Sequence, residues 1–109
     1  MFVFDYLNSI EKEKVLRAMG GQIWCPNGYW RYYFDFMVYA KGIKYSDRMY
    51  ICDKNSKVYY DIYSEKWVFR FRNVPEEHKE FFKGIPDRLK QLAEDKAKEL
   101  IGKGEISNG

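Results

Sequence analysis

The segment "VYYDIYSEKWVFRF", residues 58–71, decides the fold, because two alternating runs flank a short polar turn. The alternation on both sides of "SEK" predicts antiparallel strands over residues 57–63 and 67–73. Opposed residues of an antiparallel pair point to the same face. If Ile62 opposes Trp67, the apolar side chains of both strands share one face. A slip of one residue would turn one apolar set outward, so we expect the first register.

Two further alternating segments precede this pair. The first, "YWRYYFDFMVYA" at residues 29–40, has seven aromatic side chains, and the second covers residues 47–53. The short connections "KGIKYSD" and "KNS" favour antiparallel neighbours, which predicts a four-stranded meander. We interpret "QIWCPNG", residues 22–28, as a connection, because Pro-Asn-Gly is typical of a turn.

Helices are expected at both ends of the chain. In "NSIEKEKVLRAMGG", Asn8 and Glu11 resemble a capping box, and Gly20 and Gly21 should end the helix. The residues before Asn8 could extend this helix or form a strand-like arm, and their pattern favours neither.

The C-terminal third predicts two more helices. A short one starts at Pro75 and ends near Gly84, and a longer one starts at Pro86. Apolar residues recur at helical spacing in the longer helix. Its polar side is expected to hold Lys90, Glu94, Asp95 and Lys98. Gly102 is the expected C′ residue, and residues 102–109 are expected to form a flexible tail. The predicted fold is therefore a single α+β domain over residues 1–109, with an N-terminal helix, a four-stranded antiparallel meander and two C-terminal helices.

Positive charge and aromatic rings occur together in this chain. The net charge is only +3, but residues 22–73 hold nine basic and five acidic side chains and sixteen of the 21 aromatic ones. A small net charge does not by itself indicate nucleic acid. The basic and aromatic residues are therefore concentrated in the part of the chain that is predicted to form the sheet.

One face of that sheet is expected to be rich in Tyr and Arg. Taking the apolar face as core leaves six Tyr and four of the six Arg on the other face. Rings of this kind stack on unpaired bases, and Arg binds phosphate or carboxylate with a planar fork. The candidate binding residues are Arg31, Tyr33, Tyr39, Arg48, Tyr50, Tyr59, Tyr63, Arg70 and Arg72.

Several interpretations of this face remain open. Our first hypothesis is a non-enzymatic binding protein for single-stranded nucleic acid. The second is a small accessory or inhibitor factor of viral or mobile-element type that docks the same face on a protein, since Tyr and Arg are also enriched in protein interfaces. A homodimer could use the face as well. Alternatively, a helix covers the face, and Arg70 and Arg72 pair with Asp35 and Asp61.

The sequence favours no enzyme, metal site or cofactor. The only histidine, His78, lies among charged residues and is expected to be a solvated surface group. Cys25 and Cys52 form no CxxC pair, and we expect free thiols in a soluble, cytoplasmic protein without a membrane segment. In size, basicity and order of elements the chain resembles small metal-independent toxins that cleave messenger RNA, which implies mRNA cleavage as a minor alternative.

Overall fold

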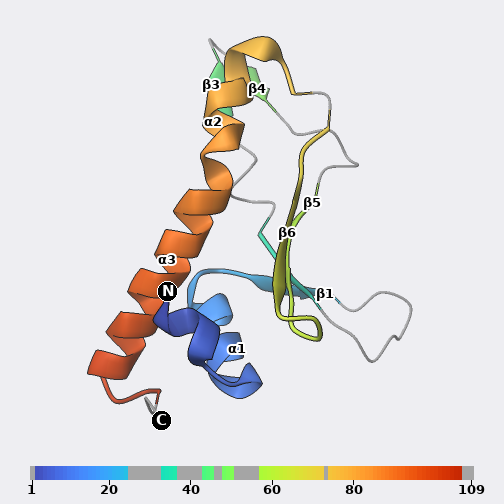
Figure 1. Ribbon diagram of the computed structural model, residues 1–109. Helices are drawn as coiled ribbons and strands as arrows, with labels where there is room; N and C mark the ends of the chain where they lie inside the picture. Colours follow the sequence, from blue (N-terminus) through green and yellow to red (C-terminus); the bar gives the residue numbers. More distant parts are fainter. Residues whose placement is uncertain are drawn as a thin grey trace.

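The computed structural model describes residues 2–24, 33–36, 43–45, 48–50, 57–72 and 74–106. Its helical and strand elements follow one another along the chain as drawn in Figure 1. They are η1 (Val3–Tyr6), α1 (Ser9–Ala18), β1 (Gln22–Trp24), β2 (Tyr33–Asp35), β3 (Ile43–Tyr45), β4 (Arg48–Tyr50), β5 (Lys57–Asp61), β6 (Lys66–Arg70), η4 (Glu76–His78), α2 (Lys79–Lys83) and α3 (Ile85–Gly102).

The predicted α+β class is confirmed, with an N-terminal helix, a four-stranded antiparallel sheet and two C-terminal helices. The sheet has the order β1-β2-β5-β6, so its strands are neighbours in chain order, as in a meander. Two strand assignments were wrong. Residues 22–24, interpreted as a connection, form β1 and pair with β2. The strand expected at 47–53 contains β4, which pairs with β3 in a separate two-stranded sheet.

The register of β5 and β6 differs from the predicted one by two residues. Trp67 opposes Tyr60 rather than Ile62, and Phe69 opposes Val58. The cause lies in the turn of residues 62–65, where an Asp61 carboxylate oxygen accepts the N–H groups of Tyr63 at 2.9 Å and Ser64 at 3.4 Å. This Asx-type turn ends the strand two residues earlier than its alternation suggests. A shift of two preserves parity, so every side chain keeps its predicted face.

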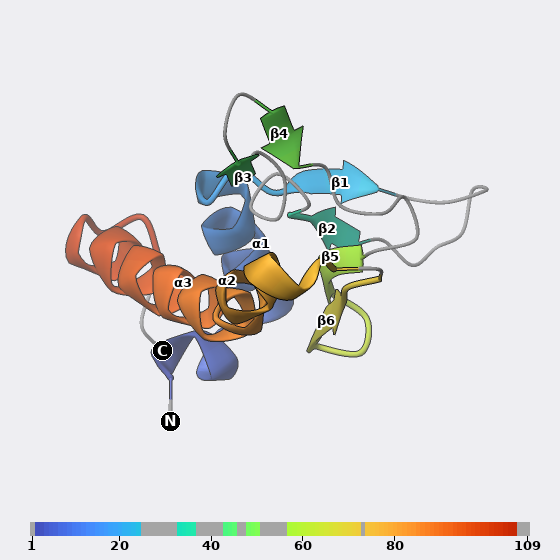
Figure 2. The ribbon, with the colours of Figure 1, turned by 90° about the horizontal axis from the view of Figure 1, so that it is seen from above.

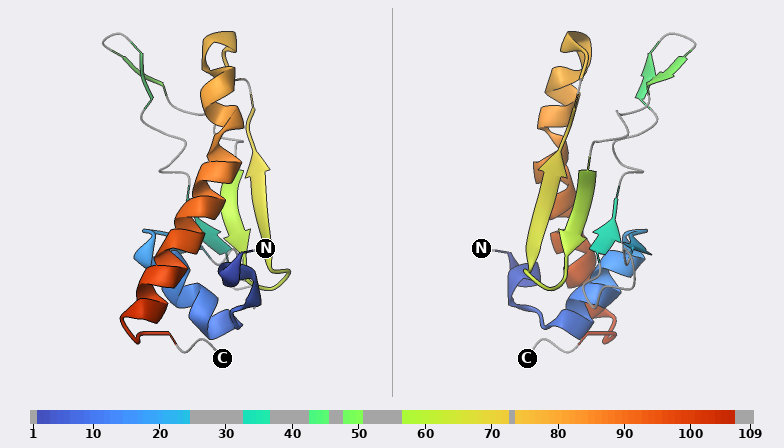
Figure 3. Two further views of the ribbon diagram at one scale, coloured as in Figure 1. Left: turned by 60° about the vertical axis from the view of Figure 1, so that its left-hand side comes forward. Right: turned by 90° about the vertical axis from the view of Figure 1, so that its right-hand side faces the viewer.

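The helices lie on one side of the sheet. Figure 2 shows β1, β2, β5 and β6 side by side, with α1 and α3 to one side, and the right-hand view of Figure 3 shows the sheet in front of α3. Phe34, Val58 and Tyr60 point to the helices and are buried. Trp67 and Phe69 share this core face and are half-buried. The described helices therefore leave the opposite face, the outer face, uncovered, and the interpretation that one of them covers it is wrong.

Both ends of α1 follow the sequence prediction. Asn8 Oδ1 accepts the N–H of Glu11 at 2.9 Å, and Glu11 Oε1 accepts the N–H of Asn8 at 3.0 Å, which completes the capping box. At the other end Gly20 has φ +90°, and Gly21 N–H donates to the Leu16 carbonyl. This bond and the left-handed conformation of Gly20 are the features of a Schellman motif.

Three predictions about the C-terminal segment were wrong: the C′ residue of the last helix, the exposure of His78 and the exposure of Glu94. The C′ residue of α3 is Gly104, with φ +75°, and not Gly102, which is still helical. Within the expected tail of residues 102–109, Ile106 is buried in the core, and residues 107–109 lie outside the described residues. His78, expected to be solvated, is buried where η4 meets α2, and Glu94 is buried although its neighbours Lys90 and Asp95 are more exposed.

The N-terminal residues explain the burial of Glu94. Residues 3–6 form a separate short helix, η1, so they neither extend α1 nor form a strand-like arm, and the Phe4 ring packs against both Tyr60 and Trp67. Val3 N–H donates to Glu94 Oε1 at 3.0 Å. Burial raises the pKa of the neighbouring Tyr60 hydroxyl above its ordinary value, and Glu65, Asp5 and Asp61 raise it further. The N-terminal segment thus packs against the core beside Tyr60 and Trp67.

Candidate functional site

Three aromatic rings form a continuous row on the outer face. The ring centroids of Trp24 and Tyr33 are 5.5 Å apart, and those of Tyr33 and Tyr59 are 4.7 Å apart. β1, β2 and β5 each supply one ring, because Trp24 opposes Tyr33 in the first ladder and Tyr59 is its diagonal neighbour in the second. Trp24 is 46% exposed, and both Tyr rings are half-buried. The row therefore offers a rigid aromatic platform with one indole edge in solvent.

Two cations lie next to this platform. Lys57 and Arg70 are directly opposed in the β5–β6 ladder, and the Lys57 ammonium lies 5.4 Å from the centre of the Trp24 ring. Like charges at opposed positions destabilise a sheet. Arg70 is exposed and forms no ion pair with any residue that the structure describes. An anion that bridges both side chains would offset their repulsion.

The charge pattern changes along the same ladder. At the turn end, Asp61 opposes Lys66, so the two charges balance there. Within the β5–β6 ladder the like-charged pair therefore lies at the Lys57–Arg70 end, and Asp35 lies opposite Tyr59 on the same face. We call Trp24, Tyr33, Tyr59, Lys57 and Arg70 together the outer-face site.

The predicted site residues divide into four groups. The structure brings together Tyr33, Tyr59 and Arg70 on the outer face. Tyr63 lies in the turn after β5 and is 60% exposed, and Arg72 lies beyond the end of β6. Arg48 and Tyr50 belong to β4, so their placement on the four-stranded sheet was wrong. Arg31 and Tyr39 lie outside the described residues.

The sequence interpretation missed two members of the site. Trp24 was assigned to a connection because Pro26-Asn27-Gly28 follows so closely, and a strand of three residues gives little alternation to detect. Lys57 has the same parity as Tyr59, and this spacing could have placed it on the outer face.

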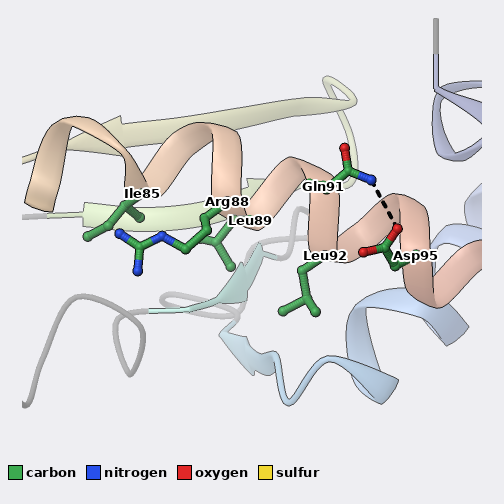
Figure 4. A pocket seen from close by; sticks show the side chains of 6 residues that line it. All are labelled: Ile85, Arg88, Leu89, Gln91, Leu92 and Asp95. Atoms are coloured by element: carbon green, nitrogen blue, oxygen red, sulfur yellow. Dashed lines mark hydrogen bonds between the residues drawn. The ribbon is translucent and has the colours of Figure 1, made fainter.

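A further hollow, lined by described residues of α3, does not bring together a recognisable catalytic group. It has a volume of about 300 Å³ and runs along α3, where Gln91 donates to Asp95 at 2.9 Å and Arg88 lies near Ile85, Leu89 and Leu92 (Figure 4). Within the described ranges, no three His, Cys, Asp or Glu side chains converge as metal ligands would. None of the described helices combines the length and apolarity needed to cross a bilayer.

Comparisons with known proteins found no match for the chain. It matches no protein-family model, no curated protein sequence and no solved structure.

Proposed function

We propose that the outer-face site binds single-stranded nucleic acid without catalysing a reaction on it. The observation that carries this proposal is the opposed pair Lys57 and Arg70 beside the contacting rings of Trp24, Tyr33 and Tyr59. A single strand presents both partners that such a site needs, unpaired bases for the rings and phosphates for the cations. Each stacked base contributes about 1–3 kcal/mol.

The geometry favours single strands over a duplex. The rings lie on a sheet surface, and bases must leave their own stack to lie on them. Trp24 at the sheet edge is the most exposed of the three, so we expect it to contribute most to stacking. Lys57 and Arg70 then contact the backbone on the β5–β6 side.

The test is a titration of a labelled oligonucleotide, as DNA and as RNA, at several salt concentrations. Trp24→Ala should weaken binding by roughly 5- to 150-fold, which corresponds to the loss of about 1–3 kcal/mol. Arg70→Ala should lower the slope of log Kd against log salt by about 0.7 if it neutralises one phosphate. Denaturation curves show whether each variant is folded.

Matched controls come from the helical side of the molecule. Tyr6→Ala removes a ring that is 71% exposed, and Lys98→Ala removes an exposed cation of α3. Both should bind the oligonucleotide as the parent does. Absence of binding at low salt, or equal losses in the control variants, would contradict the proposal. Binding of a protein partner that salt leaves unchanged would favour the docking hypothesis for the same face.

A further inference from the structure

A second surface, separate from the outer-face site, runs along the other face of β6. Trp67 and Phe69 point to the core face, and Phe71 follows them with the same parity. All three rings are half-buried: they pack against the core on one side and border open hollows on the other. We call this surface the β6 groove.

Two adjoining hollows make up the groove. One, of about 640 Å³, lies between Phe69 and Phe71 and the α2 side, with Phe82 and Pro86 as its far wall. The other, of about 430 Å³, lies between Trp67 and η1. Lys90 lines the second hollow, and its ammonium lies 6.0 Å from the Phe69 ring of the first. The two hollows therefore lie beside the core-face side chains of β6 and beside Phe71, which follows the strand.

The backbone beside the groove is available for pairing. β6 is the last strand in the sheet order, and β5 is its only hydrogen-bonded neighbour among the described strands. An edge strand with unpaired N–H and C=O groups is a template for another strand. A strand that adds to β6 would direct alternate side chains into the apolar hollows.

The charges around the groove favour an acidic occupant. Lys79 and Lys83 line its α2 end, and Lys90 lies at its middle. The facing carboxylates are Asp5, at the η1 end, and Glu76, which pairs with Lys79 at 2.7 Å. That pair is largely exposed, so it contributes little and exchanges readily. Among the described residues that line the two hollows, three are cationic and only Asp5 is acidic, so the lining itself carries an excess of positive charge.

We propose that the β6 groove binds an extended, acidic segment of a protein partner, which adds to the sheet as a fifth strand. The side chains on the groove side of the added strand are both apolar and acidic: the apolar ones occupy the hollows beside Phe69 and Phe71, and carboxylates two residues away on the same side face Lys83 and Lys90. A segment of about five residues matches the five residues of β6, because paired strands rise by the same distance per residue. This site is independent of nucleic-acid binding.

The test uses a labelled peptide of about seven residues whose odd positions, which share one face, are glutamate, valine, phenylalanine and glutamate, with threonine at the positions between them. Two matched peptides accompany it: one with lysine in place of glutamate, and one with prolines that remove the backbone donors but keep the charge. We expect the acidic peptide to bind at least about tenfold more tightly than either. Amide resonances of residues 66–71 should shift most on binding.

Two protein variants locate the peptide. Lys83→Glu should weaken binding by about tenfold or more, because it sets like charges against each other. Lys98→Glu, an exposed α3 position outside the groove, should change it by less than about twofold. Equal binding of the proline peptide would overturn strand addition, and an unchanged Kd for Lys83→Glu would overturn the groove as its location. If a saturating oligonucleotide displaces the peptide and Lys83→Glu weakens both ligands, the groove is a nucleic-acid site instead, and the proposal fails.

Discussion

Gly21 lies where the chain leaves α1 and enters β1, and the Phe36 ring packs against its α-carbon. A Cβ there would lie 2.6 Å from the Phe36 ring and 2.9 Å from the Leu16 carbonyl oxygen. Phe36 is itself fully buried and contacts Trp67 at 5.5 Å between ring centroids. The absence of one side chain thus lets α1 and β1 approach the aromatic core.

Replacement of Gly21 tests this close approach. We expect Gly21→Ala to lower the free energy of unfolding by about 1–3 kcal/mol, because the buried ring has to move. The matched control is Gly102→Ala in α3, where a Cβ meets no atom within 4 Å. Alanine is the better helix former, so the control should raise stability by about 0.5–1 kcal/mol. Urea denaturation measures both, and equal effects would contradict the role assigned to Phe36.

At the scale of elements, one ion pair links α1 to the turn between β5 and β6. Lys12, whose side chain is 4% exposed, donates to Glu65 Oε1 at 2.9 Å. Glu65 has φ 56°, a left-handed conformation that costs energy in a residue with a side chain. The contact therefore connects the helical layer to the turn that sets the strand register.

A double-mutant cycle measures this link. Lys12→Met, Glu65→Gln and the double variant should give a coupling energy of about 1–2 kcal/mol, because Lys12 is buried and its hydrogen bond is charge-assisted. The exposed pair Glu13 and Arg17 within α1, 2.9 Å apart, is the control. Its coupling should not exceed about 0.5 kcal/mol. A Lys12–Glu65 coupling no larger than this would argue against the link.

Local sequence patterns predicted most of the helices and strands, but they predicted less well which strands pair and in which register. Alternation placed Val58, Tyr60, Trp67 and Phe69 on the correct face, because parity survives a shift of two residues. The register itself depended on the Asp61 side chain, which closes the turn through hydrogen bonds that alternation does not show. The candidate site followed the same rule: Tyr33, Tyr59 and Arg70 were placed by parity, and Trp24 was missed.

The buried charges could not be predicted from spacing. On the helical pattern Glu94 belongs to a polar side, yet it is buried because residue 3 donates to it from 91 positions away. His78 is also buried, although its neighbours in the sequence are charged. Contacts of this kind depend on the packing of whole elements, which no window of a few residues contains.

On the scale of the whole molecule, β6 contributes to two surfaces at once. Arg70 points to the outer face, and Trp67 and Phe69 point to the β6 groove. The two surfaces lie on opposite faces of β6, because successive side chains of a strand point to opposite faces. The described helices lie on the groove side only (Figure 3).

If both proposals hold, the two ligands bind together. With the parent protein saturated by oligonucleotide, the Kd of the acidic peptide should change by less than about threefold at moderate salt, because charges beyond one Debye length are screened. Fluorescence anisotropy of the labelled peptide, with and without the oligonucleotide, measures this. Strictly competitive binding would show that the two surfaces are not separate.

The hydrogen bond from Val3 to Glu94 also orders events during synthesis. While the chain is being made, residue 94 leaves the ribosome long after residue 3, so Phe4 and Leu7 have no finished core to enter until α3 has emerged. Translation at roughly 5–20 residues per second leaves these side chains unprotected for several seconds. Residues 3–7 therefore leave the ribosome well before the helix that helps to bury them, and their apolar side chains are exposed to solvent and to chaperones during that interval.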